Sequence, residues 1–217
     1  YCREIPDIRD MSWATVNPAD CQRVFDAIQG VERDPKRLIH ISRPERALVK
    51  GPGSPLLEIF AKMREQDPEL TLGICRYHSM YESNPNVAGV CRRADELVEE
   101  AEGVEWLGEL GKDDLYRAIA GSALMLYPGV PDFAETGCVA ATESQLCETP
   151  FLGTHIGALP ETLNAAAVDQ GCLIQGDASS DEYQAAFVEK ALGLLARDPD
   201  GDPCLAYRDL QKSGLHW

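Results

Sequence analysis

Two glutamates, Glu135 and Glu143, lie eight positions apart in a segment whose beginning is rich in proline and glycine. We expect a helix over residues 136–147 with Glu135 at its start, which places the two carboxylates about 12 Å apart along the axis. That separation is close to the distance between the sugar and the ribose of a nucleotide sugar. Carboxylates accept charge-assisted hydrogen bonds from hydroxyls, so each could hold one ring. Any helix can carry such acids, and the spacing alone is therefore weak evidence.

Three cations, Arg43, Arg46 and Lys50, fall within eight residues after a predicted core strand at 37–42. A predicted helix begins shortly beyond them. Cations ahead of a helix N-terminus form a positive site that suits a diphosphate. The alternative is that these side chains only pair with Glu45 and with surface acids. The residues alone leave both interpretations open.

Other nucleotide and hydrolase motifs are incomplete or absent. Gly51 and Gly53 begin a dinucleotide-binding pattern, but Leu56 stands where the third glycine belongs. The sequence contains no G-x-x-x-x-G-K-S/T phosphate loop and no G-x-S-x-G nucleophile turn. His40 alternates with apolar residues inside the predicted strand, so we interpret it as a core histidine rather than a base.

The overall charge argues against two classes of partner. The 217 residues include 20 Lys and Arg against 36 Asp and Glu, a formal net charge of -16. Nucleic-acid binding and polybasic membrane attachment both need a basic surface of some length, and this sequence has none beyond the three cations at 43–50. We also expect no transmembrane segment, no signal peptide and a cytoplasmic location. Because the chain starts at Tyr1 rather than at a methionine, we expect it to be part of a longer protein.

The eight cysteines are scattered and include no C-x-x-C pair. This spacing argues against a structural zinc site. Several cysteines lie inside apolar segments, where a thiol usually behaves as a small hydrophobic group. We therefore expect them to be reduced.

Short apolar runs alternate with amphipathic stretches, which predicts an α/β fold: a doubly wound, Rossmann-like, six-stranded parallel sheet. We expect residues 1–16 to be a linker, 17–200 a ligand-binding domain and 201–217 a helical tail. In such sheets ligands bind beyond the carboxyl ends of the strands, which is where both charged segments lie. The predicted strands are 37–42, 70–75, 104–107, 123–127, 150–153 and 172–174, and the predicted helices are 21–28, 56–66, 87–100, 112–120, 136–147 and 181–196.

The segment from residue 127 to 161 carries an ordered set of motifs. A strand ends at Pro128, and Glu135 and Glu143 follow; then come a Thr-Pro strand at 149–154 and a Gly-Ala-Leu-Pro-Glu turn at 157–161. This order resembles the carboxyl-terminal domain of the retaining GT-B glycosyltransferases of family four. Ser-Arg-Pro-Glu-Arg at 42–46 is similar to a diphosphate-binding segment in a subset of those enzymes. More loosely, the resemblance extends over about residues 17–200.

The resemblance implies a role for each matching residue. Arg43 matches the diphosphate arginine, and either Arg46 or Lys50 matches its second cation. Glu135 is expected to contact the donor sugar and Glu143 the ribose. The backbone amides near Thr136, Gly137 and Cys138 are expected to meet the distal phosphate and sugar, and the loop Gly108, Glu109 and Leu110 the nucleobase, with Tyr77 or His78 shaping its pocket. Many family members have Glu-Gly-Phe-Gly at the first glutamate, whereas Ala134, Glu135, Thr136 and Gly137 stand here, which puts the sugar's identity in doubt.

The resemblance also implies a function for the whole chain. It is the carboxyl-terminal half of a GT-B fold that binds a nucleotide-sugar donor such as a UDP- or GDP-sugar and transfers the sugar with retention. No metal or other cofactor is required, because cations act on the diphosphate. An amino-terminal acceptor-binding domain or subunit is expected as the missing partner, and the isolated half is expected to turn over poorly. Two alternatives are an inactive Rossmann-like interaction module and a sugar epimerase of similar fold.

Overall fold

The structure of the protein is a computed structural model that describes residues 20–76, 79, 84–130, 132, 135–198 and 200–213. The predicted linker at 1–16 lies outside the described residues, as does the end of the predicted tail at 214–217.

Six parallel strands form one sheet in the order β3-β2-β1-β4-β5-β6. This order confirms the predicted α/β, Rossmann-like sheet. Leu38 of the central strand faces Leu72 on one side and Leu124 on the other, so branched side chains meet across the middle of the sheet. The strands are β1 (Asp34–His40), β2 (Thr71–Cys75), β3 (Val104–Gly108), β4 (Ser122–Tyr127), β5 (Phe151–Thr154) and β6 (Leu173–Ile174).

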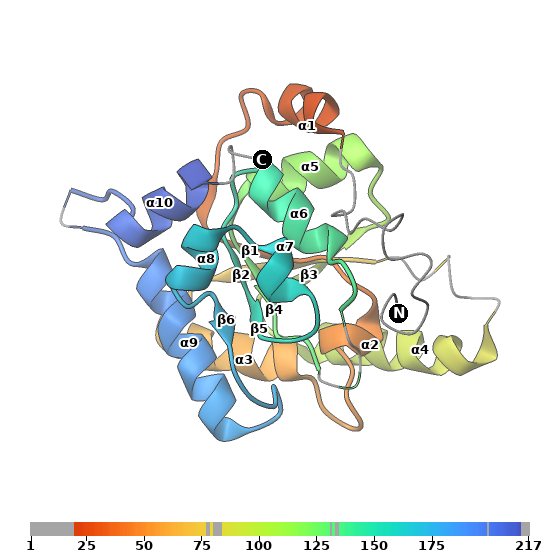
Figure 1. The fold of residues 1–217 in the computed structure, drawn as a ribbon. Helices are drawn as coiled ribbons and strands as arrows, with labels where there is room; N and C mark the ends of the chain where they lie inside the picture. The colour runs from red at the N-terminus through yellow and green to blue at the C-terminus, as the bar shows by residue number, and fades with distance from the viewer. Residues whose placement is uncertain are drawn as a thin grey trace, which may run out of the picture.

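Helices cover both faces of the sheet. Figure 1 shows α1, α5 and α6 on one face and α3, α4 and α9 on the other. The helices of the described residues are α1 (Cys21–Ile28), α2 (Pro44–Ala47), α3 (Pro55–Arg64), α4 (Pro85–Glu100), α5 (Lys112–Ala120), α6 (Val139–Leu146), α7 (Leu159–Thr162), α8 (Ala165–Asp169), α9 (Asp181–Leu195) and α10 (Leu205–Ser213).

The start of α3 illustrates how local sequence determines an element. Ser54 is the N-cap, and its side chain accepts a hydrogen bond from the backbone N–H of Leu57 at 3.2 Å. Pro55 follows at the first helical position, where a missing N–H costs nothing. The apolar stripe of the helix, including Phe60 and Met63, is buried against the core. This is the helix that the cap and the periodicity predict.

Helix α6 begins later than predicted. It starts at Val139 rather than at residue 136, so Thr136 and Gly137 are not helical. The cause lies at Glu135, whose carbonyl accepts a hydrogen bond from the N–H of Ala158 at 2.7 Å instead of entering a helical ladder. Glu135 therefore precedes the helix, and the separation of about 12 Å expected for two helical residues does not apply.

The carboxyl-terminal part of the chain also differs in detail. Helices α7 and α8 fall in a region for which the sequence predicts no helix. The predicted helical tail forms α10, in which Tyr207 and Leu210 are buried and Leu205 is 67% exposed.

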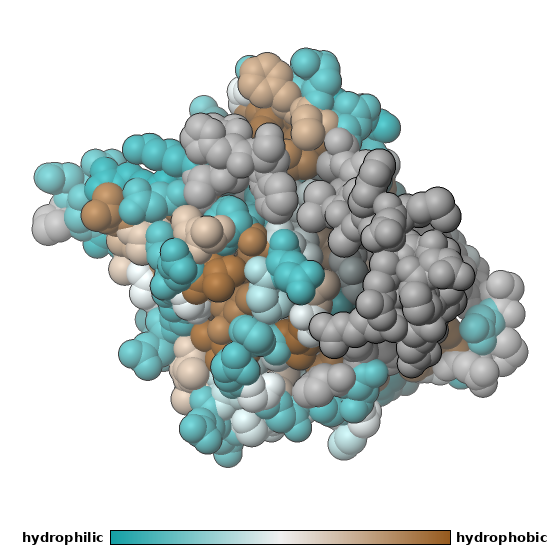
Figure 2. Space-filling view, in the orientation of Figure 1, coloured by the Kyte–Doolittle hydropathy of each residue, from teal (hydrophilic) through white to brown (hydrophobic). Residues whose placement is uncertain are grey.

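Hydrophilic side chains cover much of the described surface, and Figure 2 shows apolar side chains between them over α8 and β6. All seven described cysteines are free thiols, and Cys2 lies outside the described residues. In the part of the chain that the structure describes, no helix is long and apolar enough to cross a membrane.

Candidate functional site

A cavity of about 590 Å³ lies where the strand order reverses, at the carboxyl ends of β1 and β4. Loops that follow these two strands diverge to opposite sides of the sheet, which leaves a crevice between them. The charged residues that line the cavity are Arg43, Arg46, Lys112, Glu135 and Glu143. Three cations and two carboxylates give this lining a positive balance in a chain with a formal net charge of -16. Such a lining suits an anionic ligand that also carries hydroxyls.

Glu135 is held at the cavity by side chains from two different elements, helix α2 and the end of strand β4. Its Oε1 accepts a hydrogen bond from Nη1 of Arg46 at 2.8 Å and one from the hydroxyl of Tyr127 at 2.5 Å. Arg46 is brought there by α2, whose carbonyl at Arg46 accepts from the N–H of Val130 at 2.9 Å. Glu135 is only 8% exposed, so the charge needs these partners.

The backbone of Glu135 is seated against the turn at Gly157. Gly157 has φ +52°, and a Cβ on it would lie 2.2 Å from the carbonyl oxygen of Glu135. Only glycine combines this left-handed backbone with so close an approach. The Gly-x-x-Pro-Glu turn therefore fixes where the chain passes just before α6.

Glu143 lies on α6 and pairs with a residue for which the sequence suggests no role. Its Oε1 lies 2.5 Å from Nζ of Lys112, at the first turn of α5. Glu143 is 4% exposed, whereas the Lys112 side chain is 49% exposed and lines the same cavity. A carboxylate has about four lone-pair positions, so this ion pair leaves capacity for ligand hydroxyls.

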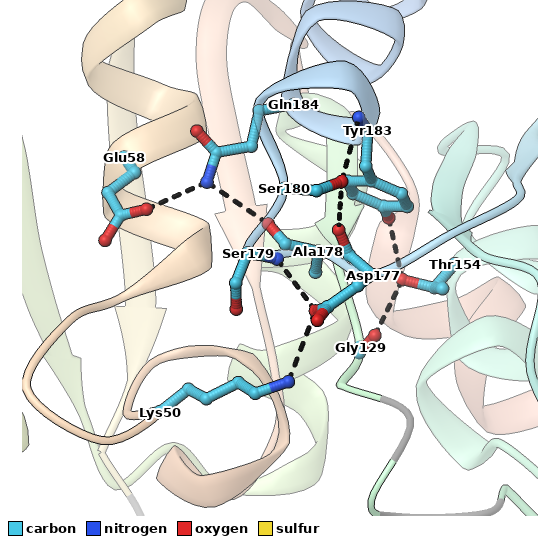
Figure 3. Close-up of polar contacts among 10 residues, drawn as sticks. All are labelled: Lys50, Glu58, Gly129, Thr154, Asp177, Ala178, Ser179, Ser180, Tyr183 and Gln184. Atoms are coloured by element: carbon cyan, nitrogen blue, oxygen red, sulfur yellow. Dashed lines mark hydrogen bonds and ion pairs between the residues drawn. The ribbon is translucent and has the colours of Figure 1, made fainter.

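The three cations of the basic loop do not gather at one place. Arg43 lines the cavity, and its Nη1 lies 3.2 Å from Oε1 of Glu45. Lys50 is not among the lining residues. Figure 3 shows it directed to Asp177, and its Nζ lies 3.2 Å from Oδ1 of that residue. Of the two residues expected to supply the second cation, the cavity contains Arg46.

Lys50 and Asp177 lie beside a network of hydrogen bonds that reaches Gly129, in the loop after β4 (Figure 3). Thr154 donates to the carbonyl of Gly129 at 2.8 Å, so its hydroxyl oxygen accepts from the hydroxyl of Tyr183 at 2.7 Å. Gly129 lies in the loop between β4 and Glu135. The network thus connects helix α9 to the loop that leads to Glu135.

The segment between Glu135 and α6 supplies one lining residue. Cys138 is the N-cap of α6 and lines the cavity, while Thr136 and Gly137 precede it as a bend and are not among the lining residues. Burial raises the pKa of the Cys138 thiol to about 12. The thiol is therefore protonated at neutral pH and is no nucleophile.

Of the three loop residues expected to contact a nucleobase, only one lines the cavity. Leu110 lines the cavity, but Gly108 and Glu109 do not; Gly108 ends β3 at φ +76°, and Oε1 of Glu109 accepts from the N–H of Ser79 at 2.9 Å. Tyr77 and His78 lie outside the described residues.

His40 is a core residue, as predicted. It is fully buried, and its Nδ1 lies 2.8 Å from the carbonyl of Leu126. Within the described ranges its Nε2 has no hydrogen-bond partner. Burial lowers its pKa to about 4, so the imidazole is neutral at pH 7.

Sequence reasoning missed Tyr127 and Lys112. Tyr127 is the last residue of β4 and reads as one more apolar position of a buried strand. Lys112 reads as an ordinary surface residue at a helix start. The available signal was their position, because Tyr127 ends a strand and Lys112 begins the helix that follows one, and ligands bind at this edge of doubly wound sheets.

No protein-family model matches the sequence, and no curated protein matches it. Solved structures do match. The match to the GtfA/B complex includes 86% of this chain and 32% of the matched chain, with a TM-score of 0.56 and 21% sequence identity. The match to Anabaena Alr3699/HepE in complex with UDP-glucose includes 92% of this chain and 47% of the matched chain, with a TM-score of 0.54 and 14% identity. The match to the UDP-GlcNAc 2-epimerase of Methanocaldococcus jannaschii includes 89% of this chain and 47% of the matched chain, with a TM-score of 0.51 and 12% identity.

This chain has the Rossmann-like fold found in GT-B glycosyltransferases. The epimerase shares that fold, so the fold alone does not distinguish transfer from epimerisation. The chain spans 32% to 47% of the length of these three structures.

Proposed function

We propose that this chain binds a nucleoside-diphosphate sugar and serves as the donor half of a retaining glycosyltransferase. The observation that carries the proposal is the pair of buried carboxylates, Glu135 and Glu143, on one cavity that also holds Arg43 and Arg46. Buried carboxylates that face a cavity are suited to hold hydroxyls, and guanidinium groups are suited to hold phosphate. A nucleoside-diphosphate sugar carries both hydroxyls and phosphates, so its binding needs both kinds of side chain.

Each part of the donor has a place in this arrangement. Arg43 contacts the diphosphate, and the N–H groups near Cys138 at the start of α6 face its distal phosphate. Glu135 accepts hydrogen bonds from the sugar. Glu143 accepts them from the ribose, and Leu110 lies beside the nucleobase. Lys112, half-exposed next to Glu143, adds a third cation near the nucleotide.

In the proposed transfer, the bond from the sugar's anomeric carbon to the distal phosphate oxygen breaks. A bond from that carbon to an acceptor oxygen forms, and the acceptor's proton passes to the departing diphosphate. Arg43, Arg46 and the helix N-terminus stabilise the charge that develops on the leaving group. In this scheme the cations make a metal unnecessary. Retention of configuration follows from the family resemblance.

A second domain or subunit is proposed to bind the acceptor. The matched structures are at least about twice as long as this chain. In complex with this donor half, the other part closes the cavity and supplies the acceptor oxygen. The donor half alone is expected to bind nucleotide and to turn over slowly.

Calorimetry tests donor binding directly. UDP, GDP and ADP are titrated into the wild-type protein, into Arg43→Ala and into Glu143→Gln. We expect one nucleotide to bind the wild type and both variants to bind it at least tenfold more weakly, because each loses charge-assisted hydrogen bonds. An interaction module of the same fold binds none of the three. Unchanged affinity in both variants contradicts the proposed site.

Epimerisation is the second candidate, favoured by the match to the UDP-GlcNAc 2-epimerase over 89% of this chain. An epimerase needs no acceptor. Incubation with UDP-GlcNAc alone, followed by proton NMR, separates the two functions. Appearance of the 2-epimer identifies an epimerase and contradicts the proposed transferase.

A further inference from the structure

Tyr127 joins the buried end of β4 to the proposed sugar site. The residue is 2% exposed, yet it lines the cavity, and its hydroxyl donates to Oε1 of Glu135 at 2.5 Å. That length is within the range of a charge-assisted O–H···O⁻ hydrogen bond. Burial also raises the pKa of Tyr127, so the hydroxyl keeps its proton and acts as a donor.

Both hydrogen bonds to Glu135 from described side chains end on the same oxygen. Nη1 of Arg46, on α2, donates to Oε1 at 2.8 Å, whereas Tyr127 donates from the end of β4. Two donors from two directions fix the carboxylate plane. Because an ionised carboxylate only accepts hydrogen bonds, Oε2 then offers acceptor sites in one defined orientation.

The backbone of Glu135 is fixed independently of its side chain. Its carbonyl accepts from the N–H of Ala158, and Gly157 packs directly on it. Glu135 is thus held at its backbone and at its side chain by contacts within the chain. A group fixed in this way loses little conformational entropy when a ligand binds.

We propose that Tyr127 is a positioning residue that pre-orients Glu135 as a hydrogen-bond acceptor, and that the site takes neutral donor sugars with a free hydroxyl at this position. The inference rests on the proposed function. Tyr127 acts through Glu135 and does not itself react. Sugars that carry a carboxylate at this position are excluded, because two like charges would meet in a poorly solvated site.

The sharpest test removes one oxygen atom. In Tyr127→Phe the hydrogen bond to Glu135 is lost while the ring and its packing remain. Tyr207→Phe is the matched control, because Tyr207 is also 2% exposed and its hydroxyl donates to the carbonyl of Ala123 at 2.5 Å, yet it does not line the cavity. Affinities for UDP, GDP and ADP and for their glucose esters are measured by calorimetry on all proteins.

The readout is the ratio of the affinity for the glucose ester to the affinity for the bare nucleoside diphosphate. We expect Tyr127→Phe to lower this ratio roughly fivefold and to leave the diphosphate affinity unchanged, in line with the loss of one hydrogen bond. Tyr207→Phe should leave both the affinity ratio and the diphosphate affinity as they are in the wild type. In a Glu135→Gln background, Tyr127→Phe has no further effect on the ratio, because the two residues act as one unit.

A second measurement does not depend on the folding of the tyrosine variant. We expect the glucuronic acid ester of the same diphosphate to bind the wild type more weakly than the glucose ester does. In Glu135→Gln the difference in affinity between the two esters should become smaller. An unchanged ratio in Tyr127→Phe, or equal loss for ester and diphosphate, overturns the inference while nucleotide binding stands. If no diphosphate binds the wild-type protein, the proposed function itself fails.

Discussion

Gly157 and Glu135 pass so close that a Cβ on the glycine would lie 2.2 Å from the carbonyl oxygen of the glutamate. We therefore expect Gly157→Ala to push the Glu135 segment out of place as well as to strain the backbone at φ +52°. The variant should lose more than about 2 kcal/mol of unfolding free energy, which exceeds backbone strain alone, and most of its preference for a sugar ester over a bare diphosphate. Urea denaturation and calorimetry measure the two effects.

Gly171→Ala is the control for this substitution. Gly171 has φ +68°, but nothing lies within 4 Å of a Cβ added there. It should show only the backbone strain, about 1 to 2 kcal/mol, with ligand affinity unchanged. Equal stability and equal affinity in the two variants would show that the contact with Glu135 is unimportant.

Arg43 and Lys50 come from one basic loop but are expected to differ in function. Arg43 lines the cavity, whereas Lys50 pairs with Asp177 outside it. Arg43→Ala should weaken binding of the preferred nucleoside diphosphate at least tenfold, because a charge-assisted contact to phosphate is lost. Lys50→Ala should change it less than twofold. A larger loss for Lys50→Ala than for Arg43→Ala would place the diphosphate elsewhere.

Lys112 is the counter-ion of a buried carboxylate, so its removal should affect stability and binding together. Lys112→Met removes the ammonium group that lies 2.5 Å from Oε1 of Glu143. Loss of one partner of a fully buried pair costs several kcal/mol, but the half-exposed Lys112 side chain reduces this to about 1 to 2 kcal/mol. Lys112→Arg should retain most of the stability.

Arg117→Met provides the comparison on the same helix. Arg117 pairs with Asp114, and both side chains are exposed, so its loss should cost under about 0.5 kcal/mol. Chemical denaturation at pH 7 compares the three variants. Equal small losses for Lys112→Met and Arg117→Met would mean that Glu143 does not depend on Lys112.

His40 should make the fold sensitive to mild acid. Its pKa falls from an ordinary 6.5 to about 4 on burial, so the unfolded chain binds the proton more readily than the folded one. The folded state is fully favoured above about pH 6.5, and stability is lost as the pH falls toward 4, by roughly 3 kcal/mol in total. Denaturation at several pH values should show this loss.

Carboxylates also titrate in this pH range, so the contribution of His40 is obtained by comparing the pH dependence of variants. His40→Leu should flatten the slope of unfolding free energy between pH 6.5 and 4. His155→Gln, at an exposed histidine, should leave that slope as it is in the wild type. Equal slopes in all three proteins would show that His40 is not responsible.

Short-range patterns in the sequence were sufficient to predict the sheet and most helices. The apolar run that becomes β4 is buried along its whole length, and the Ser54-Pro55 cap begins α3 as predicted. These features depend on neighbours in the chain, whose periodicity and capping are visible in the sequence itself. The predicted start of α6 at Thr136 was wrong, because the carbonyl of Glu135 accepts a hydrogen bond from Ala158 instead of a helical one.

The sequence by itself determined which residue types were available: two glutamates after β4, and arginines after β1. Only the tertiary structure decided their partners. It paired Lys112 with Glu143 across two helices, placed the hydroxyl of Tyr127 on Glu135, and directed Lys50 to Asp177. Such contacts depend on strand order and on the path of each loop, which bring together residues up to 127 positions apart in the sequence. Local periodicity carries no information about those distances.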